Sequence, residues 1–300
     1  MVAGALSAPL ATRRAIAAAG APRKLVLIAG KASHGPGLHE FRAGNILLEK
    51  RMRGVPGLRV ELHEQGWVRD EATLADADAV VIFCDGGKNH PAIQDGRIAL
   101  LEKLVQRGAG IGMMHFGVEV PAEKGGTEFR RWIGGHYEHQ FSCNPIWDAA
   151  FERFPDHPIA RGVQPFTIHD EWYFNMRFAE GFDATGPKTI KGVKFTPVLV
   201  AKPSDATRDG PYVYPKGPYP HIQEAKGRPE AKLWAVERPD GGRGFGFTGA
   251  HFHKNWQQDD FRKTILNALC WVSNVEVPAG GITSAAVSDD ELMQNLDPKK

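Results

Sequence analysis

The feature that most constrains the fold is a regular alternation of short apolar runs with longer amphipathic segments. The runs predicted as strands are Lys24–Gly30, Leu58–His63, Ala79–Cys84 and Ala109–Met114, and the predicted helices are Leu38–Arg53 and Pro91–Gly108. Ala79–Cys84 is continuously apolar, which is typical of a strand buried on both faces. The alternation therefore predicts an α/β fold, with a doubly wound, mainly parallel sheet and helices on both of its faces.

The second half of the chain is less regular. Further predicted strands are Phe166–Asp170, Thr196–Ala201, Lys232–Glu237 and Gly244–Thr248, and a closing helix is predicted over Asp259–Ser273. Between them lie segments rich in Gly, Pro, His and aromatic residues, at Glu123–Cys143 and Pro203–Pro229. Loops of this length in a compact domain usually form lids or binding surfaces. We therefore expect long functional loop insertions in the α/β fold.

Both ends of the chain are expected to lie outside this core. Residues 1–22 are Ala-rich, but Pro9 and two arginines interrupt the apolar stretch. We therefore expect a disordered leader, and an export signal is the alternative. The compartment therefore stays open between cytoplasm and periplasm. Residues 276–300 are polar and are predicted to form an exposed tail with a short helix near Asp289–Leu296.

Composition argues against several classes of partner. Lys and Arg number 37 and Asp and Glu 35, and there is no basic run with interleaved aromatics, so a nucleic-acid partner has no electrostatic support. No apolar run approaches the roughly 18 residues of a membrane span. Cys84, Cys143 and Cys270 lack the Cys-x-x-Cys spacing of a thiolate zinc site. Gly241-Gly-Arg-Gly precedes a strand, which argues against a phosphate loop and a nucleotide cofactor. A small molecule is the expected partner, and homo-oligomerisation stays open.

Histidines follow three of the predicted strands. His251 and His253 come after Gly244–Thr248, and they would share a face if that strand continued through them. His115 follows Ala109–Met114, and His34 and His39 follow the first strand. Ligands of open α/β sheets bind beyond the carboxyl ends of the strands. We therefore expect these side chains to meet in one cleft.

The turn at His115 resembles the nucleophile elbow of class I glutamine amidotransferases. In those enzymes the elbow carries a cysteine, whereas here it carries His115, with Gly110 and Gly112 allowing close packing beneath. A thiol acyl-transfer mechanism therefore lacks its nucleophile, and glutaminase activity is not expected.

Several motifs together resemble the trehalose-utilisation (ThuA-like) family over about residues 24–273. They are the Lys31–Phe41 segment, Gly134-Gly-His-Tyr-Glu-His139, Asp156-His-Pro158, Ile168-His-Asp-Glu-Trp-Tyr173 and Gly249-Ala-His251. The resemblance implies a flavodoxin-type, glutamine-amidotransferase-like fold, a single domain over residues 23–275 and a link to sugar catabolism, beside oxidoreductases that make 3-keto sugars. The family's motif histidines match His34, His115, His139 and His251, and its acidic motif matches Asp170, Glu171 and Tyr173.

Imidazoles with a carboxylate are suitable ligands for zinc or another divalent transition metal. The predicted metal ligands are His115, His139, His251 and His253; the predicted catalytic residues are His115, Glu171, His34 and Asp170; and the predicted substrate-binding residues are His39, Tyr173, Tyr214 and Trp256. Asp170 has an alternative role, as an acceptor that orients a histidine. Tyr214 lies in an aromatic, Pro-rich loop that fits a substrate lid, although such loops also pack on their own domain.

The leading hypothesis for function is a carbohydrate-active lyase or hydratase that acts on an oxidised (3-keto) sugar or glycoside with the help of a metal. Two alternatives stay open. One is a non-catalytic sugar-binding accessory protein, and the other is a metal-dependent hydrolase of unoxidised substrates.

Overall fold

The computed structural model describes residues 21–299. Its strands are β1 Arg23–Ala29, β2 Leu58–His63, β3 Ala79–Phe83, β4 Gly110–Met114, β5 Gly135–His136, β6 Ile146–Phe151, β7 Phe166–Glu171, β8 Arg177–Phe178, β9 Lys188–Ile190, β10 Val193–Ala201, β11 Glu230–Glu237 and β12 Arg243–Phe247. Its α-helices are α1 Phe41–Met52, α2 Arg97–Gln106, α3 Thr127–Trp132, α4 Asp205–Asp209, α5 Pro220–Gln223, α6 Asp259–Val272 and α7 Asp289–Leu292.

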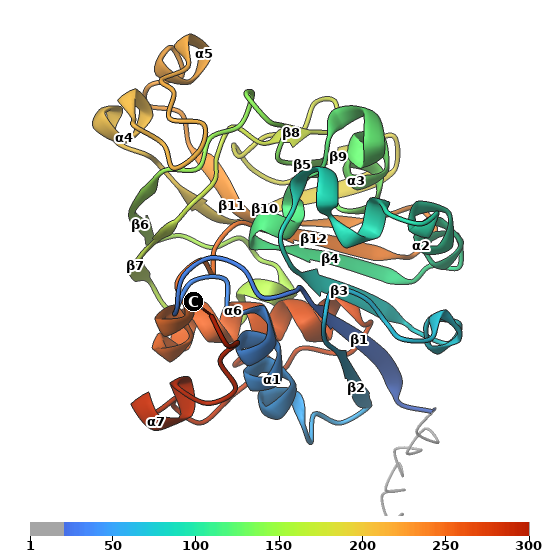
Figure 1. Cartoon of the computed structure of the whole chain (residues 1–300). Coiled ribbons are helices and arrows are strands. Elements are labelled where there is room, and N and C mark those ends of the chain that lie inside the picture. Colours follow the sequence, from blue (N-terminus) through green and yellow to red (C-terminus); the bar gives the residue numbers. More distant parts are fainter. Residues whose placement is uncertain (1–20, 300) are drawn as a thin grey trace, which may run out of the picture.

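An eight-stranded sheet in the order β2-β1-β3-β4-β12-β11-β10-β9 forms the centre of the molecule (Figure 1). Its first five strands are parallel, which confirms the predicted doubly wound part. The remaining pairs are antiparallel. The chain passes from β11 to β12 through the short turn 238–242, which is too short for the crossover that parallel neighbours require.

Helices cover both faces of the sheet (Figure 1). Leu25 and Leu27 of β1 point into one core with α1 and α6, whereas Val26 and Ile28 point into the other core with α2 and α3. This alternation follows from the two-residue repeat of a strand. Each fully buried aliphatic side chain stabilises the fold by roughly 1.5–3 kcal/mol.

Strand β4 depends on small residues for its packing. A Cβ atom on Gly110 would overlap Val272 at the end of α6, and one on Gly112 would overlap the ring of Phe245. The two glycines therefore let α6 and β12 lie directly against the strand that carries His115, as the sequence predicts.

Helix α2 starts later than predicted. The expected helix over Pro91–Gly108 is divided, because Asp95 (φ +50°) and Gly96 (φ +75°) adopt left-handed backbone conformations that no α-helix accommodates. A short 3₁₀ turn, Pro91–Ile93, precedes this break, and α2 begins at Arg97.

The insertions contain strands that the sequence reading missed. β6 pairs with β7 in a separate two-stranded antiparallel sheet, and β5 pairs with β8. The β6 sequence Ile-Trp-Asp-Ala-Ala-Phe has alternating exposed and buried side chains, so a two-residue periodicity was the available signal. This hairpin carries Glu171, the last residue of β7, to the edge of the main sheet.

In the described part of the predicted exposed tail, residues 276–299, most residues are exposed and α7 is the short helix predicted near Asp289–Leu296, but several apolar side chains pack against the domain. Val277, Ile282, Val287 and Leu292 are buried against the main core. Lys299 forms a buried ion pair with Glu40, with Nζ and Oε1 3.0 Å apart. The apolar residues of this segment are widely spaced in the sequence, so they pack against the core although the segment contains no long helix. The predicted leader falls almost wholly on residues 1–20, outside the described part.

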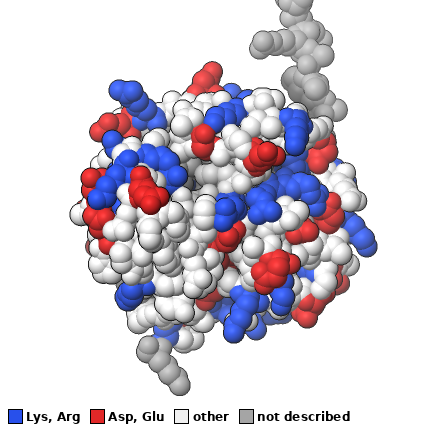
Figure 2. Space-filling view, turned by 90° about the horizontal axis from the view of Figure 1, so that it is seen from above, with Lys and Arg blue, Asp and Glu red and all other residues white. Residues whose placement is uncertain are grey.

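The charged side chains on the face shown in Figure 2 are interspersed, with acidic groups close to most basic ones. None of the helices in residues 21–299 is long and apolar enough to cross a membrane. All three cysteines are free and buried.

Candidate metal centre

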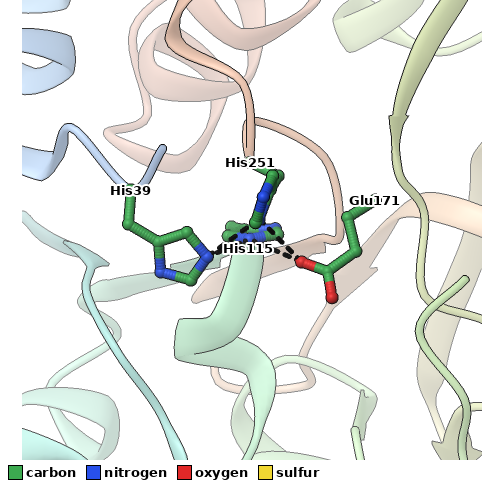
Figure 3. Close-up of side chains that lie close together, drawn as sticks. All are labelled: His39, His115, Glu171 and His251. Atoms are coloured by element: carbon green, nitrogen blue, oxygen red, sulfur yellow. Dashed lines mark hydrogen bonds and ion pairs between the residues drawn. The ribbon is translucent and has the colours of Figure 1, made fainter. Parts of the chain in front are cut away.

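Four buried side chains converge beyond the carboxyl ends of the strands: His39, His115, Glu171 and His251, which we call the His/Glu cluster (Figure 3). His39 comes from the loop between β1 and α1, His115 follows β4, Glu171 ends β7, and His251 follows β12. One ligand atom from each residue lies within 4.8 Å of the others. The expectation that several strand ends deliver histidine to one place is therefore confirmed.

Nitrogen and oxygen atoms face one another directly in this cluster. The Nε2 atom of His39 lies 2.9 Å from His251 Nδ1 and 3.1 Å from His115 Nε2. The Oε2 atom of Glu171 lies 2.7 Å from His251 Nδ1 and 3.5 Å from His115 Nε2. The hydroxyl of Tyr173 is 3.3 Å from His115 Nε2.

Hydrogen bonds made by the Nδ1 atoms of His115 and His39 fix the tautomers of these two rings. His115 Nδ1 lies 3.0 Å from the carbonyl oxygen of Thr248, which can only accept, so Nδ1 carries the proton. His39 Nδ1 lies 2.8 Å from a carboxylate oxygen of Asp85 and donates to it in the same way. Both Nε2 atoms therefore direct lone pairs toward the centre of the cluster. Because these two nitrogen atoms lie 3.1 Å apart, their lone pairs repel unless a cation or a proton lies between them.

Burial sets the protonation of these groups. It lowers the pKa of His39 and of His115 far below the ordinary value of histidine, so both rings are neutral, which is the form that binds metal. Burial also raises the pKa of Glu171, and the hydrogen bond from His251 opposes that shift. His39 and His115 thus supply neutral nitrogen donors, and Glu171 supplies the single carboxyl group of the cluster.

The donor set fits a divalent transition metal. Tetrahedral zinc, with bonds of about 2.0–2.2 Å to nitrogen and oxygen, separates its ligand atoms by about 3.3–3.6 Å. Four of the six separations between ligand atoms run from 2.7 to 3.5 Å and the other two lie within 4.8 Å, so the shortest would open by some tenths of an ångström around such an ion. The outer acceptors, Thr248 and Asp85, are the carbonyl and carboxylate partners that usually orient metal-binding histidines.

Strained backbone conformations hold the cluster. His39 (φ +48°), His115 (φ +53°) and Ala250 (φ +81°), which precedes His251, are all left-handed. Such residues cost about 1–3 kcal/mol each and persist where the surrounding structure over-determines them. The sharp turn expected at His115 is present at the end of β4.

Asp170 lies behind the cluster and fixes its backbone. Its carboxylate accepts hydrogen bonds from the N–H groups of Ala250 at 2.6 Å and His251 at 3.0 Å. Burial raises the pKa of Asp170, and the backbone hydrogen bond from Ala250 opposes that shift. This geometry favours the alternative role stated above, in which Asp170 orients a histidine.

His34 lies at the outer side of the cluster. Its ring stacks on that of His39 with centroids 3.6 Å apart, and its side chain is 39% exposed. Its Nδ1 lies 2.9 Å from Ser33 Oγ and 3.8 Å from the Asp85 carboxylate. His34, His39 and Asp85 form a second group of potential ligands beside the first.

Two of the four predicted metal ligands lie outside the cluster. His139 is exposed, with its ring 6.0 Å from that of Tyr214. His253 is buried, but its Nε2 faces the carbonyl oxygen of Leu292 at 3.1 Å. The strand argument for pairing His251 with His253 was wrong, because β12 ends at Phe247 and His253 begins a 3₁₀ helix.

The predicted substrate-binding residues divide into different environments. Tyr214 is 70% exposed, whereas Tyr173 is buried beside His115. Trp256 is 1% exposed and packs against Phe83 and Phe261, so it belongs to the core and is not available to a substrate. His39, also assigned to substrate, lies at the centre of the His/Glu cluster.

The sequence reading missed three polar residues around the cluster. Asp85 follows β3 after one intervening residue, Cys84, so the strand-end argument would have found it. Asn144 donates from Nδ2 to Glu171 Oε1 at 2.9 Å and accepts at Oδ1 from the N–H of Tyr214 at 3.1 Å. Burial and the charge of Glu171 raise the pKa of Glu119 to about 8. The last two depend on tertiary contacts that leave no local pattern.

Comparisons with known proteins agree with this architecture. The family model described as "Trehalose utilisation" matches residues 26–272. A ThuA-like protein from Bacteroides uniformis is similar in structure, with a TM-score of 0.57, 13% identity, and coverage of 87% of this chain and 95% of the other. One from Parabacteroides merdae has a TM-score of 0.54, 17% identity, and coverage of 89% and 94%. A search among curated proteins gave no significant match.

Proposed function

This chain belongs to the trehalose-utilisation (ThuA) family, and from that membership and the His/Glu cluster we propose that it is a carbon–oxygen lyase or hydratase acting on a 3-keto sugar or glycoside. The family points to sugar metabolism. The convergence of the two Nε2 lone pairs of His39 and His115 carries the proposal of a metal-assisted site. The reaction type rests on the chemistry that such a site supports.

His39, His115, His251 and Glu171 would hold a divalent metal, whose chemical contribution is Lewis-acid polarisation of a substrate ketone. A polarised ketone acidifies the neighbouring C–H. In elimination from a 3-keto glycoside, the C2 proton passes to a base, a C1–C2 double bond forms, and the C1–O bond breaks with its electron pair on oxygen. The leaving oxygen then takes a proton from an acid. Hydration is the reverse sequence with water as the alcohol.

His34 and Glu119 are suited to the two proton transfers. His34 is partly exposed and lies against His39, and burial lowers its pKa, which leaves the ring neutral and able to accept a proton. Glu119 has a pKa raised to about 8 by burial and by the nearby Glu171, so its carboxyl carries a proton at neutral pH. We assign the base role to His34 and the acid role to Glu119.

The exposed Tyr214 supplies an aromatic surface for a sugar ring. Its backbone N–H binds the side chain of Asn144, which also binds Glu171. The neighbouring Val213 N–H also donates to the carbonyl oxygen of Asn144 at 3.3 Å, so Asn144 links the loop to Glu171, which supports a role of the loop as a substrate lid.

The test is turnover of a 3-keto glycoside by metal-loaded protein in ¹⁸O-labelled water, with product identified by mass spectrometry. We expect an enone or its hydrate, formed by the wild type and by His139→Ala but not by His115→Ala. His139 is a matched control because it is exposed and outside the cluster. Hydrolysis of an unoxidised glycoside with label incorporation would favour the hydrolase alternative, and sugar binding without any turnover would favour the accessory protein.

A further inference from the structure

The last part of the described chain, residues 276–299, returns to the candidate metal centre. We call these residues the C-terminal segment. The family model matches residues 26–272, so the segment lies beyond the matched part. It follows α6, packs apolar side chains on the core, and ends beside the loop between β1 and α1, which carries His39 (Figure 1). A contribution of this segment to the site would therefore be a property of this chain, beyond the family model.

The carboxylate of Glu40, the residue after His39, joins this loop to the C-terminal segment. Its side chain is 1% exposed. Oε1 accepts a hydrogen bond from the N–H of Gly37 at 2.9 Å and lies 3.0 Å from Nζ of Lys299, while Oε2 accepts from the N–H of Asp297 at 3.1 Å. A buried carboxylate is costly unless an opposite charge and hydrogen-bond donors surround it. Lys299, with a side chain that is 2% exposed, supplies that charge.

The ammonium group of Lys299 binds the chain on both sides of His39. Besides its ion pair with Glu40, it donates to the carbonyl oxygen of Leu38. His39 has a left-handed backbone (φ +48°), and its N–H donates to the carbonyl oxygen of His251 at 3.0 Å. A residue keeps such a conformation only where the surrounding structure fixes the neighbouring backbone. Lys299 fixes that backbone at Leu38 and Glu40, and the backbone sets the direction of the His39 ring.

The same segment also contacts the part of the chain that carries His251. Nε2 of His253 lies 3.1 Å from the carbonyl oxygen of Leu292, and the N–H of His253 donates to the carbonyl oxygen of Gly37 at 2.9 Å. The C-terminal segment, the His39 loop and the chain after β12 are therefore each linked to the other two. The loop and the chain after β12 each supply one member of the His/Glu cluster, His39 and His251.

A second charged contact attaches the C-terminal segment away from the site. The carboxylate of Glu291, in α7, lies 2.6 Å from Nη2 of Arg51 and 2.7 Å from Nζ of Lys50, both in the last turn of α1. The His39 loop precedes the opposite end of that helix, so the length of the helix separates the two attachments by roughly 15 Å. Each attachment can therefore be removed while the other stays.

We propose that Glu40 and Lys299 are positioning residues for the candidate metal centre. Their buried ion pair fixes the backbone from Leu38 to Glu40, so that Nε2 of His39 stays directed at the centre of the cluster. The inference rests on the proposed function only in treating the His/Glu cluster as the functional site. The order of the His39 loop can be measured without metal and without turnover.

The experiment measures hydrogen–deuterium exchange of the full-length, metal-free protein by mass spectrometry, with peptides that cover the His39 loop. Lys299→Met keeps the length of the side chain but removes its charge and its donors. In this variant the amides of Gly37 and His39 should exchange at least about tenfold faster than in the wild type. Lys299→Arg keeps the charge and the donors and should restore slow exchange. Peptides from β1, β4 and α6 should exchange as in the wild type in both variants, which shows that the fold is intact.

Glu291→Gln is the matched control, because it removes the attachment of the same segment to α1. It should lower the urea midpoint of unfolding and leave the exchange of the His39 loop as in the wild type. The inference is overturned if the loop amides are unprotected in the wild type, if Lys299→Met leaves their exchange unchanged, if Lys299→Arg behaves as Lys299→Met, or if Glu291→Gln accelerates the exchange as much.

Turnover gives a second readout in metal-loaded protein. The kcat for a 3-keto glycoside should fall by about tenfold in Lys299→Met, recover in Lys299→Arg and stay unchanged in Glu291→Gln. A wild type that turns over no 3-keto glycoside would count against the proposed function alone, because the exchange measurement decides whether the ion pair positions the loop.

Discussion

The Nε2 atoms of His39 and His115 lie 3.1 Å apart, and each ring donates its other N–H to a fixed oxygen acceptor. Two neutral imidazoles therefore present lone pairs to the same point in a buried site. This relationship joins residues that are 76 positions apart in the chain. A cation or a proton at that point relieves the repulsion, and the ligand atoms of the four residues lie close enough together to hold a metal ion.

The first prediction concerns the identity of the ligands. Purified without a histidine tag, the wild type should contain about one equivalent of a divalent metal, and His39→Ala and His115→Ala should lose it, because each removes a converging nitrogen. His139→Ala should keep it. Elemental analysis by mass spectrometry makes the measurement. Metal retained in both cluster variants would disprove the ligand set.

The second prediction concerns Asp85. Asp85→Ala removes the acceptor that fixes the tautomer of His39, so metal affinity should fall by about 10–100-fold without loss of the fold. Competition with a chelator gives the affinity, and circular dichroism checks the fold. Unchanged affinity would show that His39 needs no outer partner.

The third prediction concerns Asp170. Asp170→Asn replaces an acceptor oxygen with an NH₂ group that faces backbone N–H donors, so the free energy of unfolding should fall by about 1–3 kcal/mol. Metal affinity should fall with it, because Ala250 and His251 lose their anchor. Asp148→Asn, at an exposed position of the partner strand, is the control and should change stability by less than about 0.5 kcal/mol. Urea unfolding of both variants measures the two free energies of unfolding, and equal losses of stability in Asp170→Asn and Asp148→Asn would contradict the prediction.

The fourth prediction concerns pH. Because burial raises the pKa of Glu119 to about 8, the folded protein binds this proton more tightly than the unfolded chain does. Its contribution to stability is complete below the ordinary pKa of glutamate and is lost as pH rises toward 8. Glu119→Gln removes this dependence, so wild-type stability should fall relative to the variant by at most about 1.4 kcal/mol per pH unit between about pH 4.5 and 8. Parallel pH profiles in urea unfolding would contradict the shifted pKa.

The fifth prediction concerns the lid. Tyr214→Ala should raise KM for a sugar substrate several-fold with little change in kcat or stability, because the side chain is 70% exposed and contacts no reacting group. Tyr214→Phe keeps the aromatic face and should behave as the wild type. Lys216→Ala, exposed in the same loop, controls for loop disturbance. Equal KM values for Tyr214→Ala and the wild type would remove this residue from the substrate site.

Local sequence pattern was sufficient for the parallel half of the sheet. Continuous apolar runs such as Ala79–Cys84 and periodic segments such as α6 are specified by hydrophobic burial, which depends on neighbouring residues. The short strands β5, β8 and β9 have two or three residues each and depend on pairing with distant segments, so they left no usable signal.

For the site, the sequence by itself determined which edge of the sheet gathers histidines, because parallel strands end on the same side. Only the tertiary structure decided which histidines meet. His39 enters the cluster and His253 turns away because of left-handed backbone at His39 and Ala250 and because Asp170, 81 residues from His251, holds its N–H. Sequence spacing predicts which side chains lie at the ends of strands, whereas long-range hydrogen bonds and left-handed backbone conformations decide the direction in which each side chain points.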